Sequence, residues 1–433
     1  RGRIIGAIGI DEREEFRVED RLRVFSSKAI ILATGGAGEV FRIHVFPEGM
    51  TGDGYALAYR AGAELVNMEF IQIGPASIKT RLNCSGSLMR AIPRFVNEAG
   101  EEFLQNYLPR ETSPSEISDL VFEKGSSWPV SLEKRTHLID VAMFKEIAQG
   151  HRVFLDYSIN PKSFQFQNLD PKWQERYERE VKFQIDPGQR AASPFRRLSE
   201  INPDSIEWLK GHGIDLGAGE KIEIAPCIQH FQGGIKIRGK GNTSLKGLYA
   251  AGECAGGQHG ANRPGGNALL DGQAFGRISG REAAEAAMKF KQEPQVILRR
   301  VKQFRSKLNR LDKGKEASWV REEIQSITSR FASVVRTEEG LRQGLKRLKV
   351  LKKEGVAIDD KGMAFALETE NLLDVAEMIL RACFLRKESR GPHLFFRRFE
   401  DPHPLPSQDR KGKRYIVIQN RSGKMVLERR VPV

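Results

Sequence analysis

The chain has 433 residues, of which 39% are hydrophobic and 29% are charged, and its formal net charge at pH 7 is +14. This length predicts two or three domains, and the apolar share is sufficient for a sizeable core. No run of 18 apolar residues occurs, so we expect no transmembrane helix. The four cysteines lack CxxC spacing, which favours a reducing, cytoplasmic location and argues against a metal or iron–sulfur site in this chain.

The positive charge is concentrated in one window. Residues 289–353 contain 19 Lys and Arg against 7 Asp and Glu. Such a window can be a solvated helical face, a docking face for an acidic partner, or a contact with an anionic membrane surface. Peripheral association with a membrane therefore stays open. We expect no nucleic-acid binding, because no interleaved aromatic residues or groove-reading motif accompany the charge.

The first third of the chain predicts strands and one helix. Residues 4–10 and 21–25 alternate as in a β-hairpin around the charged turn 11–15. Residues 28–34 form a near-continuous apolar run, which predicts a parallel strand buried on both faces. A helix follows over 51–63, with Thr51 or Asp53 as its cap, and residues 65–73 return as a strand.

The pattern changes after residue 74. From 75 to 221, short helices alternate with proline-containing loops, and residues 141–148 are amphipathic. A hairpin strand is expected at 233–237. Apolar positions at helical spacing predict helices within 292–385, and the alternation over 414–433 predicts a terminal β-hairpin.

The stretch 247–287 organises the rest of the chain. An apolar run at 248–251 predicts a buried strand, a glycine-rich loop follows, and a helix is expected to begin near Asn267. Glycines allow backbone to lie against a flat or phosphorylated ligand, and the N-terminus of the helix favours negative charge. Glu253, the one acid at the end of the strand, is placed to accept ribityl or ribose hydroxyls. Glycine spacing alone fits a structural turn equally well.

The wording of this stretch is more specific than its glycine spacing. GLYAAGE, HGANR, NALLD and FGR resemble the C-terminal flavin-binding segment of the succinate dehydrogenase/fumarate reductase flavoprotein family, which includes L-aspartate oxidase. The resemblance continues in ILATGGAG (31–38), TGDGYALAYRAGAELVNMEF (51–70) and ESRGPH (388–393). It therefore extends over most of the chain.

The resemblance implies an α/β fold. We expect a partial Rossmann-like FAD-binding domain with an inserted α+β capping domain, a C-terminal helical domain and a β-hairpin tail. The expected boundaries are 1–74 and 222–291 for the two parts of the FAD-binding domain, 75–221 for the capping domain, 292–400 for the helical domain and 401–433 for the tail. The family's initial strand–GxGxxG–helix unit has no counterpart in this sequence, so we expect a fragment truncated at its N-terminus.

FAD is the cofactor that the resemblance implies. Arg263, in HGANR, matches the arginine that binds a substrate carboxylate beside the flavin, which suits a bidentate guanidinium. We take Arg263, His230 and Gln229 as candidate catalytic residues. The candidate cofactor-binding residues are Thr34, Gly35, Gly36, Asp53, Gly252, Glu253, Asn267, Ala268 and Leu269.

The dicarboxylate half of the family's site has diverged. Gly74 stands where the family has a histidine, Ser85-Gly86 lies where it has threonine and glutamate, and Val141 occupies the place of the proton-transferring arginine. Gln229 and His230 replace its second histidine and a tyrosine. We expect the small residues Gly74 and Gly86 to widen the pocket. New donors are sought among Gln72, Arg90, Arg94, Gln229 and His259.

The resulting functional hypothesis is an FAD-dependent oxidoreductase. It would transfer hydride between flavin and a small organic acid or related substrate other than succinate or fumarate. A separate iron–sulfur subunit is a candidate electron partner, because this chain has no ligands for a cluster. The alternatives are a flavin-holding electron-transfer subunit without an organic substrate, an L-aspartate oxidase-like enzyme, and an incomplete product that cannot retain flavin.

Overall fold

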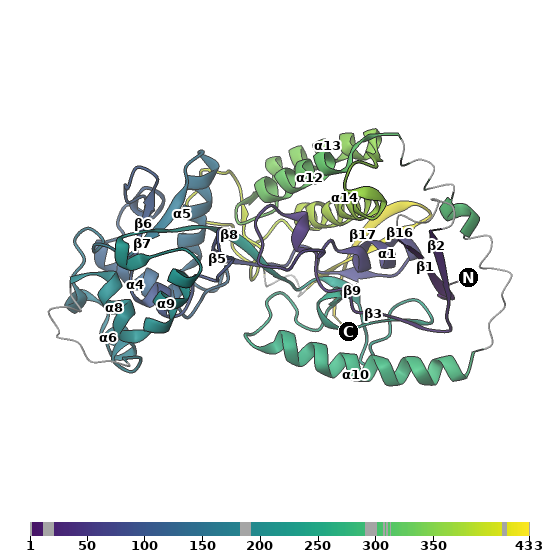
Figure 1. Cartoon of the computed structure of the whole chain (residues 1–433), viewed down its shortest axis with the longest axis horizontal. Helices are drawn as coiled ribbons and strands as arrows, with labels where there is room; N and C mark the ends of the chain where they lie inside the picture. Colours follow the sequence, from purple (N-terminus) through teal and green to yellow (C-terminus); the bar gives the residue numbers. More distant parts are fainter. Residues whose placement is uncertain are drawn as a thin grey trace.

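Two hydrophobic clusters divide the chain into two lobes, as Figure 1 shows. The computed structural model describes residues 2–11, 21–181, 192–290, 301–305, 308, 311, 313–408 and 414–432. The cap lobe consists of the described residues between 78 and 221, and the core lobe contains most of the remainder. Strands β5 (Ile71–Ser77) and β8 (Ile222–Phe231) pair with each other where the lobes join.

The core lobe is built from small sheets. Its further strands are β1 (Gly6–Ile10), β2 (Leu22–Ser26), β3 (Ile30–Leu32), β4 (Leu65–Val66), β9 (Gly234–Lys236), β10 (Leu248–Ala250), β11 (Ala255–Gly256), β12 (Lys315–Glu316), β13 (Arg336–Thr337), β14 (Val356–Ala357), β15 (Phe395–Phe396), β16 (Tyr415–Arg421) and β17 (Lys424–Arg430). A five-stranded sheet has the order β11-β9-β4-β16-β17. Separately, β3 pairs with β10 in parallel, with Leu32 opposite Ala250.

Helices cover these sheets on two sides. They are α1 (Asp53–Ala61), α10 (Asn267–Met288), α12 (Ala317–Phe331), α13 (Glu338–Glu354) and α14 (Gly362–Leu385), with the 3-10 turns η2 (Gly38–Val40) and η5 (Gly252–Cys254). In Figure 1, α12 and α13 lie above the sheets and α10 lies below them. The three helices α12, α13 and α14 pack against one another, and α14 also packs on α1.

The cap lobe has its own sheet and core. Strands β6 (Arg94–Asn97) and β7 (Val153–Asp156) extend the β5–β8 pair into a four-stranded sheet of order β5-β8-β7-β6. Its helices are α2 (Ser87–Arg90), α3 (Leu104–Tyr107), α4 (Pro114–Lys124), α5 (His137–Ala148), α6 (Pro171–Glu178), α8 (Pro194–Ile201) and α9 (Pro203–Gly211), with the turns η3 (Phe166–Asn168) and η4 (Leu216–Ala218). Proline at the first helical position begins α4, α6, α8 and α9, because its missing N–H would have no helical partner there.

Several expectations from the sequence are confirmed. The β1–β2 and β16–β17 hairpins form, although the charged turn 12–15 lies outside the described residues. The helix α10 begins at Asn267. All four cysteines are buried free thiols. Within the described ranges, no helix combines the length and apolar character that crossing a membrane requires.

Other expectations are wrong for identifiable reasons. The strand expected to be buried on both faces, β3, is only partly covered: among the described strands it pairs with β10 alone, and Ile31 is 39% exposed. Neither Thr51 nor Asp53 caps α1, because Gly52 takes the N-cap in a left-handed conformation (φ 75°) that would disfavour both.

The expected strand over 65–73 is interrupted by Asn67, whose φ is 58°. It therefore forms two strands, β4 and β5, which belong to different sheets. The expected hairpin strand at 233–237 is β9, which pairs with β4 and β11 and has no hairpin partner in β8. The chain turns between β8 and β9 at Gly233, which lies against the backbone of Asn67 too closely for any side chain.

Candidate functional site

The two parallel strands β3 and β10 end at the same edge, and the glycine-rich segments follow them there. Thr34-Gly35-Gly36 follows β3, and Gly252-Glu253 follows β10. Helix α10 packs against η5, which brings the segment Asn267–Leu269 to this edge as well. The carboxyl ends of parallel strands are the usual place for a cofactor in an α/β protein. The structure therefore brings most of the candidate cofactor-binding residues together.

Close packing at this edge explains two of its glycines. A Cβ on Gly36 would lie 2.5 Å from Oε1 of Glu253, and one on Gly54 would overlap the hydroxyl of Thr34. Gly35 adopts a φ of 71° beside the sulfur of Met50. These glycines are required by the protein's own packing.

The glycines of the long loop are different. A Cβ on Gly252, Gly260, Gly265 or Gly266 would meet no protein atom within 4 Å. Leu269, in the first turn of α10, is 82% exposed. Open space along a glycine-rich loop that ends at a helix N-terminus fits a flat, phosphate-bearing cofactor.

Glu253 is almost fully enclosed. Its Oε1 accepts a hydrogen bond from the backbone N–H of Phe231 at 2.8 Å, and Oε2 lies 3.9 Å from Nε2 of His230. Burial raises the pKa of this carboxyl to about 7, although the N–H of Phe231 and the charge of Arg263 both act to lower it. The second oxygen is available to a ribityl hydroxyl, whereas the first is already used.

Two histidines face each other beside this carboxyl. The ring centroids of His230 and His259 are 6.1 Å apart at a steep angle. Burial lowers the pKa of His230 to about 3, helped by the charges of Arg263 and His259, so its ring is neutral at physiological pH. His259 lies 3.8 Å from the carboxylate of Asp271 in α10, and burial lowers its pKa as well.

Arg263 is held from a distant part of the chain. Its guanidinium donates to Oε1 of Gln72 at 2.9 Å, and the amide nitrogen of Gln72 donates to Asn262 and to the carbonyl of Arg263. The guanidinium also donates to the carbonyl of Pro264. Gln72 therefore fixes both the loop and the side chain, and burial lowers the pKa of Arg263.

A β-bulge places Gln229. The register of the β5–β8 pair changes between Gln72, which is opposite His230, and Ile73, which is opposite Ile228. Gln229 is the extra residue, and its amide nitrogen is buried without a partner among the described residues. Bulges next to active sites redirect side chains in this way.

Further polar atoms around the site lack partners. Besides Gln229 Nε2, these buried atoms are Nε of Arg263, Oε1 of Gln232 and Oε1 of Gln258, judged over the described chain. Buried polar groups without partners are costly, so several in one place indicate that a polar ligand completes the site. The residues present therefore fit FAD and a polar substrate.

The structure corrects the expectation that Gly74 widens the pocket. A Cβ there would lie 2.8 Å from the indole of Trp128, whose Nε1 donates to the carbonyl of Pro75. The space of the absent histidine is thus filled by an aromatic ring from the cap lobe. Gly86, in contrast, has open space around it, and Val141 is buried at 1% exposure inside the joined hydrophobic core.

Two further candidate donors are used elsewhere. Arg90 pairs with Glu180 at 2.6 Å and Arg94 with Asp156 at 2.5 Å, both within the cap lobe. Asp53, at the start of α1, accepts a hydrogen bond from Asn371 of α14. These side chains are held by structural partners.

Residues that sequence reasoning did not single out also belong here. Asp271 lies beside His259, and Gln232 approaches Nδ1 of His230 at 3.2 Å. Gln258 donates to Asp271. Asp271 ends the NALLD motif, so its sequence context was a usable signal, but Gln232 and Gln258 carry no such signal.

The site defines a flavin-binding α/β protein, and comparison with known proteins agrees. The FAD binding domain family matches residues 1–269, and the fumarate reductase flavoprotein C-terminal family matches residues 321–409. The chain belongs to the FAD-binding family of fumarate reductase-type flavoproteins, whose cofactor is FAD.

Individual relatives give the same result. The chain is 29% identical to the flavoprotein-like component of fumarate reductase (CoM/CoB) from Methanothermobacter marburgensis, over 97% of this chain and 68% of that protein. It is 28% identical to L-aspartate oxidase of Yersinia pestis, over 93% of this chain and 66% of that protein. A solved quinol–fumarate reductase with menaquinol molecules superposes with a TM-score of 0.73 at 25% identity, covering 100% of this chain and 70% of the other. The chain spans about two thirds of the length of the curated relatives it matches.

Proposed function

We propose that the protein is an FAD-dependent oxidoreductase that acts on a small organic anion other than succinate or fumarate. The observation that carries this proposal is Arg263, whose guanidinium is fixed by Gln72 beside Glu253 and two buried histidines. Bound FAD would accept or deliver a hydride at this site. Thr34, Gly252, Glu253 and the N-terminus of α10 would hold it.

Arg263 is the residue suited to bind the substrate. Its guanidinium is partly buried, it keeps a donor atom without a partner, and its other donors are oriented by Gln72 and Pro264. A carboxylate or similar anion is stabilised by such a group through charge-assisted hydrogen bonds. The binding energy then orients the substrate toward the flavin.

Glu253 and His230 are suited to hold protons. The carboxyl of Glu253, with a pKa of about 7, exists in both protonation states near neutrality. The ring of His230 is neutral, so it can donate through one nitrogen and accept through the other. A group with a pKa near the working pH is effective in general acid–base catalysis.

The second carboxylate of a dicarboxylate has no matching cation. Trp128 fills the space beside Gly74, and Val141 lies buried where a guanidinium would be needed. An unpaired carboxylate in this environment costs more than the roughly 1–3 kcal/mol of an unmatched polar contact. We therefore propose a monoanionic substrate, with poor turnover of succinate, fumarate and aspartate.

Anaerobic flavin reduction tests this proposal. The protein loaded with FAD is mixed with succinate, L-aspartate and a panel of monocarboxylates, and the flavin absorbance is followed. Reduction by a monocarboxylate is expected to be faster than by either dicarboxylate and to fall at least about 100-fold in Arg263→Gln. Equal rates in Arg263→Gln, or fastest reduction by succinate, would contradict the proposal.

A second candidate is an electron-transfer subunit without an organic substrate. It is favoured by Trp128 and Val141, which close the side of the site where the family binds its second carboxylate. In either case we propose that the electron partner is a separate iron–sulfur subunit and that the location is cytoplasmic. Flavin reduction by a reduced partner protein, with none by any organic acid, would favour this candidate over the enzyme.

A further inference from the structure

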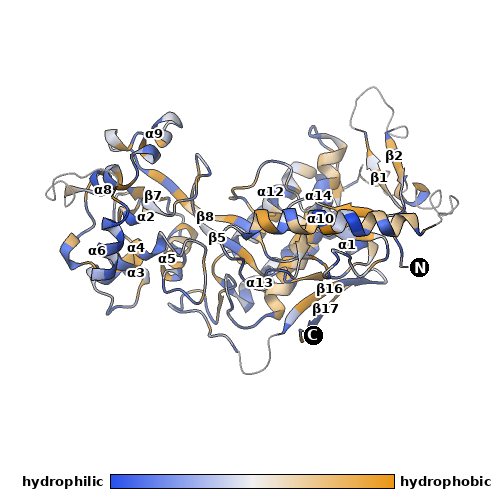
Figure 2. Cartoon of the chain, turned by 90° about the horizontal axis from the view of Figure 1, so that it is seen from below, coloured by the Kyte–Doolittle hydropathy of each residue, from blue (hydrophilic) through white to orange (hydrophobic). Residues whose placement is uncertain are grey.

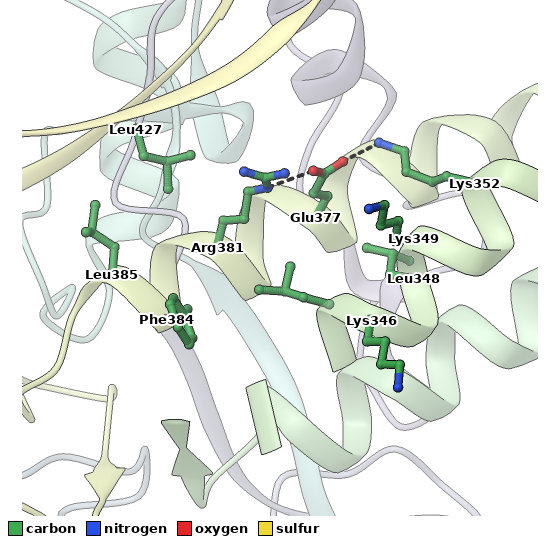
Figure 3. A pocket seen from close by; sticks show the side chains of 10 residues that line it. Lys346, Leu348, Lys349, Lys352, Glu377, Arg381, Phe384, Leu385 and Leu427 are labelled. Carbon is green, nitrogen blue, oxygen red and sulfur yellow. Dashed lines mark hydrogen bonds and ion pairs between the residues drawn. The ribbon is translucent and has the colours of Figure 1, made fainter. Parts of the chain in front are cut away.

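A trough runs over the surface of the core lobe between α13, α14 and the β16–β17 hairpin. One part, shown in Figure 3, has a volume of about 660 Å³, and a second part of about 510 Å³ extends it toward the turn of the hairpin. The two parts share Lys352, Glu377 and Arg381, so they form one continuous depression. We call it the α13–α14 trough. It is formed by different side chains from those of the flavin site.

The floor of the trough is apolar. Leu348 of α13 is 1% exposed, while Leu345, Phe384 and Leu427 are partly buried and pack against the main hydrophobic cluster. These side chains come from three different elements, α13, α14 and β17. They give the trough a floor that apolar side chains of a ligand could cover.

The rim of the trough is cationic. Its two acids, Asp374 and Glu377, are already shared among three cations. Asp374 pairs with Arg60 and Lys352 at 2.8 Å each, and Glu377 pairs with Lys352 at 2.5 Å and with Arg381 at 2.7 Å. The dashed lines in Figure 3 mark the pairs of Glu377. No acid on the rim is therefore left to neutralise further cations.

Three more lysines line the trough. Lys346 and Lys349 project from α13, and Lys424 lies at the start of β17. All three are exposed or half-buried, and within the described residues none of them forms an ion pair. They belong to the basic surplus of the chain, two of them within the window 289–353. The trough thus combines an apolar floor with unneutralised positive charge on both sides.

We propose that the α13–α14 trough is a docking site for an acidic, amphipathic segment of a partner protein. Apolar side chains of that segment would cover Leu345, Phe384 and Leu427, and its carboxylates would meet Lys346, Lys349 and Lys424. An amphipathic helix laid in an apolar groove is a common mode of recognition, and complementary charge sets its specificity and association rate.

Two other occupants fit less well. A membrane surface is flat, whereas the apolar residues here lie at the bottom of a concavity. Single-stranded nucleic acid is bound by exposed aromatic faces on which bases stack, and the lining has one aromatic ring, Phe384, among aliphatic side chains. A peptide segment uses both the apolar floor and the charged rim.

Fluorescence anisotropy of the FAD-loaded protein with a labelled synthetic peptide tests the proposal. The peptide is about 16 residues long, with leucines at helical spacing and glutamates at the other positions. Saturable binding is expected, and it should weaken at least about tenfold in Lys346→Glu/Lys349→Glu. The matched control is Lys162→Glu/Lys246→Glu, which removes the same charge at exposed lysines outside the trough and should bind within about twofold of wild type.

Further variants separate the two parts of the proposal. Lys424→Glu, on a different element, should weaken binding in the same direction even if the double variant of α13 proves unstable. A peptide with serines in place of the leucines should bind weakly, because it leaves the floor uncovered. Equal weakening in the control variant would overturn the proposal. Undiminished binding of the serine peptide, or saturable binding only to anionic phosphatidylglycerol vesicles or to an oligonucleotide, would also overturn it.

Discussion

Two groups of buried charged residues lie near each other in the core lobe but differ in how they are paired. In the closed cluster, Arg386 donates to Glu69 at 2.7 Å, and Arg336 donates to the ring of His393 and to the carbonyl of Glu69. All four side chains are at most 5% exposed. Direct hydrogen bonds join every member to another, although Oε2 of Glu69 and Nη2 of Arg336 lack partners among the described residues.

The site cluster is held apart. His230 and Glu253 approach only to 3.9 Å, and His259 and Asp271 only to 3.8 Å. Its polar groups are oriented from behind, by the N–H of Phe231 and by Gln72, while their other sides remain open. The comparison indicates that the closed cluster stabilises the fold, whereas the site cluster is arranged for a ligand that it does not supply itself.

The sharpest test of this difference is the loss of one arginine from each cluster. Arg386→Gln leaves the buried carboxylate of Glu69 uncompensated, and breaking such a pair costs about 3–5 kcal/mol of unfolding free energy. Arg263→Gln removes hydrogen bonds in a partly open site and should cost only about 1 kcal/mol. Urea denaturation of the two variants measures both values. Similar losses in the two would show that the site cluster is structural as well.

The pH dependence of stability isolates Glu253. Its folded pKa of about 7 is above the usual value of 4.5, so the folded state holds this proton more tightly than the unfolded state does. The favourable contribution is complete below pH 4.5 and is lost as the pH rises through 7. Glu253→Gln keeps an oxygen for Phe231 and should therefore stabilise the cofactor-free protein by about 3 kcal/mol at pH 8 but have little effect at pH 4. A variant with no gain at pH 8 would place Glu253 in a solvated environment.

The contact between Gly74 and Trp128 gives a smaller effect. In Gly74→Ala the new methyl group meets the indole, so the ring must shift, which we expect to cost about 1–3 kcal/mol. In a Trp128→Leu background the same methyl group has room, and its cost should fall below about 1 kcal/mol. Thermal unfolding of the four proteins of this cycle measures the coupling. Additive effects would mean that the indole does not occupy this space.

Local parts of the fold followed from the sequence. Alternating residues predicted both hairpins, and the strand, glycine loop and helix around Gly252 were placed correctly because each depends on a local pattern. The incomplete burial of β3 was not predictable from its own residues, since Ile30–Leu32 is apolar whether or not a second strand lies beside it. Burial depends on neighbours that a run of residues does not specify.

The candidate site was predictable only in part. The residues at the strand ends and Arg263 carry a recognisable pattern. The hydrogen bond between Gln72 and Arg263 joins residues 191 positions apart, and the indole of Trp128 reaches Gly74 from another lobe. Contacts of this kind depend on how the lobes pack, so an expected wide pocket beside Gly74 proved to be a filled one. Figure 2 shows how far the two lobes extend from the strands that join them.

The central claim is that the glycine-rich loop before α10 holds FAD. Gly265→Leu tests it directly, because a side chain there meets no protein atom within 4 Å and the backbone is not left-handed. Gly211, at the exposed end of α9, has the same properties and provides the matched control. In a titration followed by flavin fluorescence, wild type and Gly211→Leu should bind FAD equally, and Gly265→Leu should bind at least about tenfold more weakly. A wild-type protein that stays colourless at saturating FAD, or unchanged affinity in Gly265→Leu, would contradict the account.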